Sequence, residues 1–177
     1  DLSLGVICPA IVRPHWLREA QAMGVDRLEA LSSYNGVVGN FAERQRLSVC
    51  DILIVDEAHF CKHAESQRTT AIFGSDGIAK TVLARGGMVW CLSGTPMPRN
   101  PAELFPVLRS LCPVTLANRG PDPYMAWLNR FCEWTATRHG IKVYGSKNDD
   151  LLRDILDKVM LRRIVKDVPN DLPPLRW

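Results

Sequence analysis

The sequence predicts an α/β fold: three layers around a mainly parallel sheet, followed by a C-terminal helical extension. Three short apolar runs each stop at a polar cluster, and segments with helical spacing lie between them. Strands that alternate with crossover helices form right-handed βαβ units, and such units build a parallel sheet. Open sheets of this kind collect functional groups at the carboxyl ends of their strands, so we expect the site there.

The apolar runs predict the strands. Residues 4–8 form the first run, and a helix is predicted over 16–23, where apolar residues recur at helical spacing until Gly24. Residues 52–55 and 87–92 form the second and third runs. The second run is continuous and rich in β-branched residues, which is typical of a strand buried on both faces of a parallel sheet.

The second half of the chain changes to a helical pattern. Apolar residues recur at helical spacing over 104–111, 124–134 and 149–158. We therefore expect two parts: a sheet-bearing domain over residues 1–112 and a helical extension over residues 113–177.

Two groups in this half invite a nucleic-acid interpretation, and we favour a structural one for both. An aromatic stripe with i, i+4, i+7 spacing is interpreted as core packing instead of base stacking: Trp127, Phe131 and Trp134. A basic tail is interpreted as a partly buried brace, because apolar residues interrupt it: Arg162, Arg163 and Lys166.

The composition narrows the class of protein. It is 46% hydrophobic and 23% charged, which is ordinary for a globular chain and excludes disorder. The apolar runs are far shorter than the roughly 20 residues that cross a bilayer, so we expect no membrane segment. Six cysteines without a CxxC pair favour a reducing, intracellular setting in the cytoplasm, nucleoid or nucleus. The net charge of +3 permits a polyanionic partner without requiring one.

Two adjacent carboxylates, Asp56 and Glu57, follow the second strand directly. Carboxylates at the end of a buried strand are costly to desolvate, and a magnesium ion would offset their charge. In the hydrolysis of nucleoside triphosphates the first carboxylate holds magnesium, often through water, and the second deprotonates the attacking water. The structural alternative is that both residues begin a loop and cap a helix.

A second polar cluster, Ser93-Gly94-Thr95, ends the third strand. Two small hydroxyl residues around a glycine can approach both the acidic motif and the phosphates closely. Alone this cluster is an ordinary turn. In sequence with the acidic motif about 35 residues earlier, it indicates a nucleotide site.

These motifs resemble those of the Swi/Snf-like ATPases, members of the helicase superfamily with DEAD/DEAH boxes, over nearly the whole chain. The similarity is to their first RecA-like lobe, and the wording Phe131-Cys132-x-Trp134 is most similar to the annealing-helicase-like branch. The matching segments are the DNA-side motif at 6–10 and 15–19, the "hhSY" motif at 31–34, the Walker-B box at 56–59, "LTGTP" at 92–96 with Asn100 and Glu103, and the "LRRxKxDV" segment at 160–168.

The resemblance implies a role for each matched residue. Glu57 would activate water, with Asp56 and His59 completing the catalytic set, and Asp56 would also hold magnesium through water beside ATP. Coupling between the nucleotide site and the DNA groove would fall to four residues: His59, Ser93, Gly94 and Thr95. The backbone of the tracked strand would lie near another four: Pro9, Ala10, Ser33 and Tyr34.

The function implied is an ATP-dependent translocase on duplex or branched DNA that remodels protein–DNA structures. Its implied partners are DNA and a second RecA-like lobe of the same protein, to which residues 113–177 would connect. The family's phosphate loop needs a GK[ST] sequence, and none occurs in these 177 residues. We therefore expect the chain to be a piece of a larger enzyme and to be inactive alone.

Three alternatives stay open. The first is a non-catalytic module of helicase fold that binds DNA or protein. The second is an RNA helicase, which the Trp16 segment disfavours. The third is a zinc site at His59, Cys61 and His63, disfavoured because no second pair of ligands with the usual spacing occurs.

Overall fold

The computed structural model describes residues 2–113 and 122–163. The chain divides into two compact units, Asp1–Lys147 and Asn148–Trp177, which are described separately below. The boundary expected from the change of sequence pattern between residues 112 and 113 stays a prediction. Among the helices that the structure describes, none is long and apolar enough to cross a membrane.

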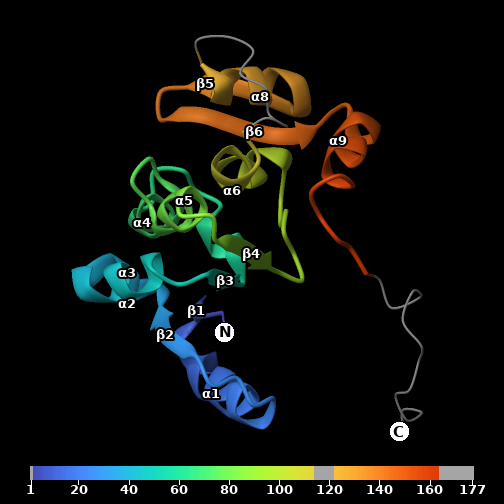
Figure 1. The fold of residues 1–177 in the computed structure, drawn as a ribbon. Helices are drawn as coiled ribbons and strands as arrows, with labels where there is room; N and C mark the ends of the chain where they lie inside the picture. Colours follow the sequence, from blue (N-terminus) through green and yellow to red (C-terminus); the bar gives the residue numbers. More distant parts are fainter. Residues whose placement is uncertain (1, 114–121, 164–177) are drawn as a thin grey trace, which may run out of the picture. The chain divides into compact units, whose positions relative to one another are not determined.

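The first unit is built on a four-stranded parallel sheet (Figure 1). Its strands are β1 (Leu4–Cys8), β2 (Leu28–Ser33), β3 (Ile52–Asp56) and β4 (Met88–Leu92), in the order β2-β1-β3-β4. All three pairings are parallel, which confirms the predicted α/β class. The strand β2 was not predicted, because its sequence is short of β-branched residues and it lies at the edge of the sheet.

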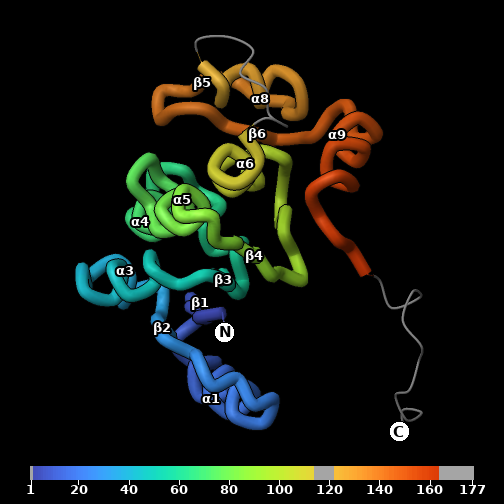
Figure 2. Tube along the Cα trace, viewed as in Figure 1, coloured from blue at the N-terminus to red at the C-terminus, as the bar shows by residue number. Residues whose placement is uncertain are grey.

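Helices cover both faces of this sheet. The helix α1 (Arg13–Ala22) follows the short 3-10 helix η1 (Ala10–Val12). The other helices that pack on the sheet are α2 (Tyr34–Gly39), α3 (Phe41–Ser48), α4 (Gln67–Phe73) and α5 (Ile78–Ala84). The trace in Figure 2 shows α3, α4 and α5 on one side of the strands and α1 on the other.

The alternation of side chains along the strands divides the core in the same way. Leu53 and Val55 face one way and pack with residues of α2 to α5, whereas Ile54 faces the other way. Trp16 of α1 packs on the Ile54 face. Successive residues of a strand point to opposite faces, so one β-branched run supplies two apolar layers.

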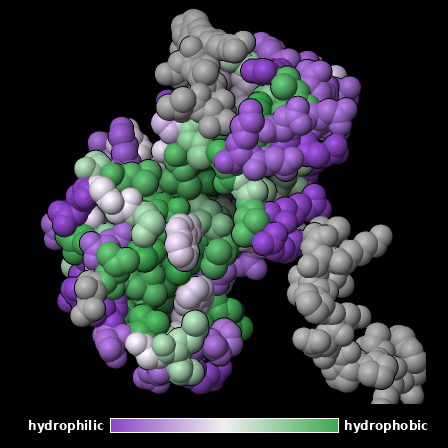
Figure 3. All heavy atoms as spheres, turned by 45° about the vertical axis from the view of Figure 1, so that its right-hand side comes forward, coloured by the Kyte–Doolittle hydropathy of each residue, from purple (hydrophilic) through white to green (hydrophobic). Residues whose placement is uncertain are grey.

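The cover on the Ile54 face does not extend over β4. Apolar side chains reach the surface in Figure 3, and the exposed ones on this strand are Met88 at 43%, Trp90 at 51% and Leu92 at 41%. Trp90 is aligned with Ile54 on the neighbouring strand, which places it on the same face. An exposed edge strand with apolar side chains favours association with further chain or protein.

Two 3-10 helices follow strands of the sheet: η2 (Ala58–Cys61) comes after β3, and η3 (Pro101–Leu104) comes after β4. The remainder of the first unit, after η3, comprises α6 (Phe105–Leu111), α8 (Pro123–Phe131) and an antiparallel hairpin of β5 (Cys132–Thr137) and β6 (Gly140–Ser146). The hairpin corrects the prediction of a purely helical region. Thr135 and Thr137 favour a strand, and the turn ends at Gly140, whose φ of 110° suits glycine.

The aromatic stripe is therefore only partly a helical face. Trp127 and Phe131 lie on α8, are buried, and contact each other with ring centroids 4.5 Å apart and ring planes tilted by 54°, as expected for core packing. The indole of Trp127 donates to the carbonyl oxygen of Pro101 at 2.9 Å. Trp134 lies instead on β5, and its indole donates to Oδ1 of Asn129 at 3.0 Å.

The second unit contains α9 (Asp149–Leu156), close to the helix predicted over 149–158. Its buried residue is Leu152. Arg162 and Arg163 are exposed at the end of the described residues, and the brace interpretation of the basic tail stays a prediction. Lys166 and the rest of the "LRRxKxDV" segment lie outside the described residues.

A short polar contact ties the start of the chain to β3. The Oδ2 atom of Asp51 accepts from both the backbone N–H and the hydroxyl of Ser3, each at 2.8 Å. In return, the backbone N–H of Asp51 donates to the side-chain oxygen Oγ of Ser3 at 3.0 Å. The hydrogen bond from the Ser3 backbone N–H, and to a lesser extent the one from the Ser3 hydroxyl, hold the pKa of the Asp51 carboxyl below its ordinary value.

Stability should therefore depend on Asp51 in a pH-dependent manner. A carboxyl whose pKa is lower in the folded state stabilises the fold above its unfolded pKa, and that stabilisation is lost as pH falls through the folded pKa. We expect Asp51→Asn to unfold at lower urea concentration than wild type at about pH 7, and the gap to shrink by about pH 3. A gap that stays constant across this range would contradict the assignment.

Candidate functional site

The turn after β3 holds the backbone in a conformation that side chains rarely adopt. Glu57, the residue between Asp56 and η2, has φ 54° and ψ 48°, in the left-handed region. For a residue with a Cβ this conformation costs about 1–2 kcal/mol. The turn is closed by the N–H of Phe60, which donates to the carbonyl oxygen of Glu57 at 2.9 Å. Strain of this kind persists where the surroundings fix the backbone, and such places cluster at functional sites.

A chain of polar side chains joins the ends of β3 and β4. The Nδ1 atom of His59 lies 3.0 Å from Oε2 of Glu57 and 3.0 Å from Oγ of Ser93. The N–H of Thr95 donates to the same serine oxygen at 3.1 Å. The structure thus brings together four of the predicted site residues, from two neighbouring strands. Gly94 lies between them in open space, where an added Cβ would meet no atom within 4 Å.

Asp56 is held by two aromatic donors from distant parts of the chain. The indole N–H of Trp16 donates to its Oδ2 at 2.9 Å. The hydroxyl of Tyr34 lies 2.7 Å from the backbone oxygen of Asp56 and 3.1 Å from that of Glu57, and donates to this pair. Burial, and then the charge of Asp56, raise the pKa of the neighbouring Cys8 thiol to about 11.

The four residues predicted to lie near nucleic acid have different environments. Pro9 and Ala10 follow β1, and Ala10 is exposed. Ser33 caps α2, because its side-chain oxygen accepts from the N–H of Gly36 at 3.0 Å. Tyr34 is only 5% exposed, and its hydroxyl faces the Asp56–Glu57 turn. A direct contact with a nucleic acid strand does not fit that burial, whereas the other three stay candidates.

An ion pair connects the two loops that carry the site. Nζ of Lys62, just beyond η2, lies 3.6 Å from Oε1 of Glu103 in η3. Oε2 of the same glutamate accepts from the N–H of Arg99 at 2.8 Å, and the side chain is only 8% exposed. Sequence reasoning matched Glu103 to a motif but gave it no partner. In the sequence, the one indication of a partner for Glu103 is Lys62, a lysine shortly after the acidic box at 56–59.

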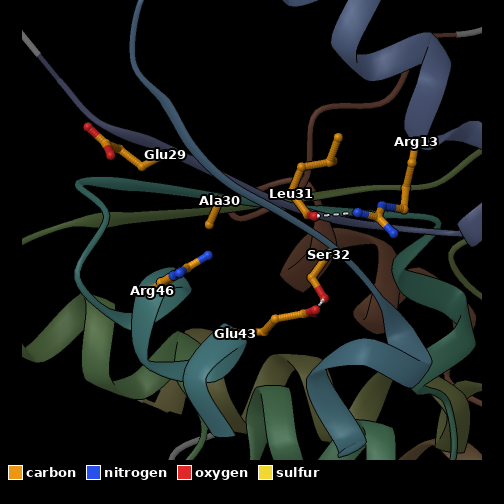
Figure 4. A pocket seen from close by; sticks show the side chains of 7 residues that line it. All are labelled: Arg13, Glu29, Ala30, Leu31, Ser32, Glu43 and Arg46. Carbon is orange, nitrogen blue, oxygen red and sulfur yellow. Dashed lines mark hydrogen bonds between the residues drawn. The ribbon is translucent and has the colours of Figure 1, made fainter. Parts of the chain in front are cut away.

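A polar cavity of about 180 Å³ lies along the edge strand β2, and neither Asp56 nor Glu57 lines it (Figure 4). One guanidinium nitrogen of Arg13 donates to the backbone oxygen of Leu31 at 3.2 Å, and the hydroxyl of Ser32 bonds to the Glu43 carboxylate. The contact from Arg13 satisfies a carbonyl on the edge strand. The lining residues are Arg13, Glu29, Ala30, Leu31, Ser32, Glu43 and Arg46.

The zinc alternative receives no support from the geometry. Across residues 2–113 and 122–163, no three side chains among His, Cys, Asp and Glu are grouped so that they could hold a metal ion. Cys61 is fully buried in the main core, the cluster that includes Leu53 and Val55. Burial there raises the pKa of its thiol to about 12. A zinc ligand has to be a thiolate, which this environment disfavours.

Comparison with known proteins gives a family for the chain. The model of the SNF2-related domain matches residues 16–176. A cattle protein named SWI/SNF-related matrix-associated actin-dependent regulator of chromatin subfamily A-like protein 1 is 31% identical over 138 residues. The match covers 76% of this chain and 13% of that protein, so the chain spans about an eighth of the relative's length. The human DNA annealing helicase and endonuclease ZRANB3 is 26% identical over 123 residues, covering 70% of this chain and 11% of that protein.

A solved structure supports the fold independently. The SWI2/SNF2 ATPase core of Sulfolobus solfataricus in complex with dsDNA superposes with a TM-score of 0.63 at 20% identity. The match covers 97% of this chain and 36% of the other. At this identity the likeness establishes the fold, a RecA-like lobe with a parallel sheet flanked by helices.

The Lys62–Glu103 pair should matter for stability more than a surface pair does. Glu103→Ala leaves a partly buried ammonium and a backbone N–H without an acceptor, so we expect a loss of about 1–3 kcal/mol in the free energy of unfolding. Glu29→Ala breaks the exposed pair of Arg27 and Glu29 and should cost less than about 1 kcal/mol. Urea denaturation of both variants measures the difference. Equal losses would show that the bridge does not brace the loops.

Proposed function

The chain belongs to the SNF2-related domain family, and from that premise we propose that it is the hydrolytic lobe of an ATP-dependent DNA translocase. One observation carries the proposal: the array that joins Glu57, His59 and Ser93 at the carboxyl ends of β3 and β4, beside Asp56. We assign residues 1–112 to part of the ATP-binding lobe. Residues 113–177 form an extension toward a second RecA-like lobe.

The donor set at Asp56 fits magnesium. Its Oδ2 atom accepts from Trp16, while Oδ1 takes no hydrogen bond from the residues that the structure describes. Magnesium prefers hard oxygen donors and keeps several waters, so one carboxylate acting through water is a suitable protein ligand. Bound with ATP, magnesium supplies positive charge that neutralises the phosphate oxygens.

Glu57 is suited to the role of general base. Its side chain is 42% exposed, and one of its two oxygens faces His59, which leaves the other for water. Glu57 accepts a proton from the water that attacks the γ-phosphorus of ATP. The bond between this phosphorus and the β–γ bridging oxygen breaks, giving ADP and inorganic phosphate. His59, whose Nδ1 atom also contacts Ser93, holds the carboxylate in place during this step.

Duplex DNA is the polymer that we propose for the lobe. The names of relatives and of the structural neighbour include DNA annealing helicase and a complex with dsDNA. Pro9, Ala10 and Ser33 lie at the same edge of the sheet as the hydrolytic residues, where the strand backbone would be held. Contacts to phosphates do not read base sequence, so binding is salt-sensitive and nearly independent of sequence. These roles imply work inside the cell on nuclear or nucleoid DNA.

The first test is ATP turnover by the full natural protein that carries this chain. We expect duplex DNA to stimulate turnover, and Glu57→Gln to lower kcat by a factor of about 10² to 10⁴ while ATP still binds, because the general base is lost. Glu29→Gln, a surface change on β2, serves as the matched control. If the wild-type protein hydrolyses nothing with any nucleic acid, the lobe is instead a non-catalytic binding module.

The second test concerns the 177-residue chain by itself. It contains no GK[ST] sequence and therefore lacks the loop amides and lysine that bind phosphates in the family. We expect weak ATP binding by calorimetry and no measurable phosphate release with or without DNA. A robust rate from the purified chain would refute this expectation.

A further inference from the structure

We propose that Trp16 and Tyr34 are positioning residues that couple the DNA-side segments of the lobe to the hydrolytic turn at Asp56 and Glu57. The inference rests on the proposed function and adds the physical connection through which DNA would act on ATP hydrolysis. Its basis is that two hydrogen-bond donors, from the separate helices α1 and α2, converge on one aspartate.

The first connection starts from the loop after β1. Pro9 and Ala10, which we propose to lie near the DNA backbone, lead through η1 directly into α1, where Trp16 lies. The Trp16 indole is packed against the core cluster of Val6, Cys8 and Ile54 and donates to Oδ2 of Asp56 at 2.9 Å. A rigid ring fixed at both ends transmits a shift of α1 to the carboxylate that would hold magnesium.

The second connection starts from Ser33, the last residue of β2. Ser33 caps α2, and Tyr34 is the first residue of that helix. Its ring is buried in the main core and contacts Phe60 edge-on, with centroids 5.4 Å apart. Its hydroxyl donates to the consecutive backbone oxygens of Asp56 and Glu57. These two oxygens lie on either side of the left-handed Cα of Glu57. A shift of Ser33, at the junction of β2 and α2, therefore moves the backbone of the general base.

Both connections act on the turn and not on ATP or DNA. Tyr34 is too deeply buried to touch either ligand, and its phenol stays protonated because burial raises its pKa. In both cases a change to phenylalanine removes the donor and keeps an aromatic ring. The pair can therefore be tested by removing donors while most of the packing is kept.

The experiment measures the ratio of DNA-stimulated to basal ATP turnover in the full natural protein. The variants are Trp16→Phe, Tyr34→Phe and the double substitution. Trp134→Phe removes an indole donor on the hairpin, and Tyr144→Phe removes the hydroxyl of a residue that is 65% exposed, so these two are matched controls. We expect each test variant to lower the ratio at least about fivefold, the range of a real coupling between two sites. The controls should keep it within about twofold.

The ratio separates the outcomes because it does not depend on the fraction of protein that is folded. If both test variants lose turnover equally with and without DNA, the two aromatics are merely structural and the inference is overturned, while the proposed function stands. If the wild-type protein shows no stimulation by DNA, the proposed function and the inference both fall. If one variant does not fold, the ratio of the other decides.

Discussion

The left-handed turn at Glu57 is the constraint on which the site depends. It ends β3 abruptly, places the second carboxylate beside His59, and lets η2 begin at once. An isolated peptide would relax this conformation, so the surrounding fold has to hold it. The parallel sheet makes this feasible, because it brings the ends of β1, β2, β3 and β4 to one edge, from which loops can support the turn.

Support for the turn comes from polar contacts that are anchored in apolar packing. Tyr34 donates from within the main core, and Trp16 donates from the opposite face of the sheet. Each face of the sheet therefore contributes one donor to Asp56. On the other side, the nearly buried carboxylate of Glu103 fixes the loop after β4 to Lys62. These contacts hold the acidic turn and the loop after β4 at the same edge of the sheet.

Sequence alone was sufficient where local pattern and burial agree. Continuous apolar runs identified three strands, and their polar ends identified the acidic box and the serine-threonine cluster. The strand β2 was missed because it has no β-branched residue, and the hairpin was missed because polar residues interrupt its apolar ones. The bond between Trp16 and Asp56 joins residues 40 positions apart, which no local pattern can reveal. Tyr34 was expected near DNA from its motif, yet tertiary packing turns its hydroxyl inward.

The most direct measurement of the central claim is displacement of a third DNA strand from a duplex by the full natural protein. If ATP hydrolysis at the Asp56–Glu57 turn drives movement along duplex DNA, that movement would remove a bound third strand without any separation of the duplex. The account predicts displacement with ATP and none with a non-hydrolysable analogue or with Glu57→Gln. Duplex binding without any ATP-dependent displacement by the wild-type protein would contradict it.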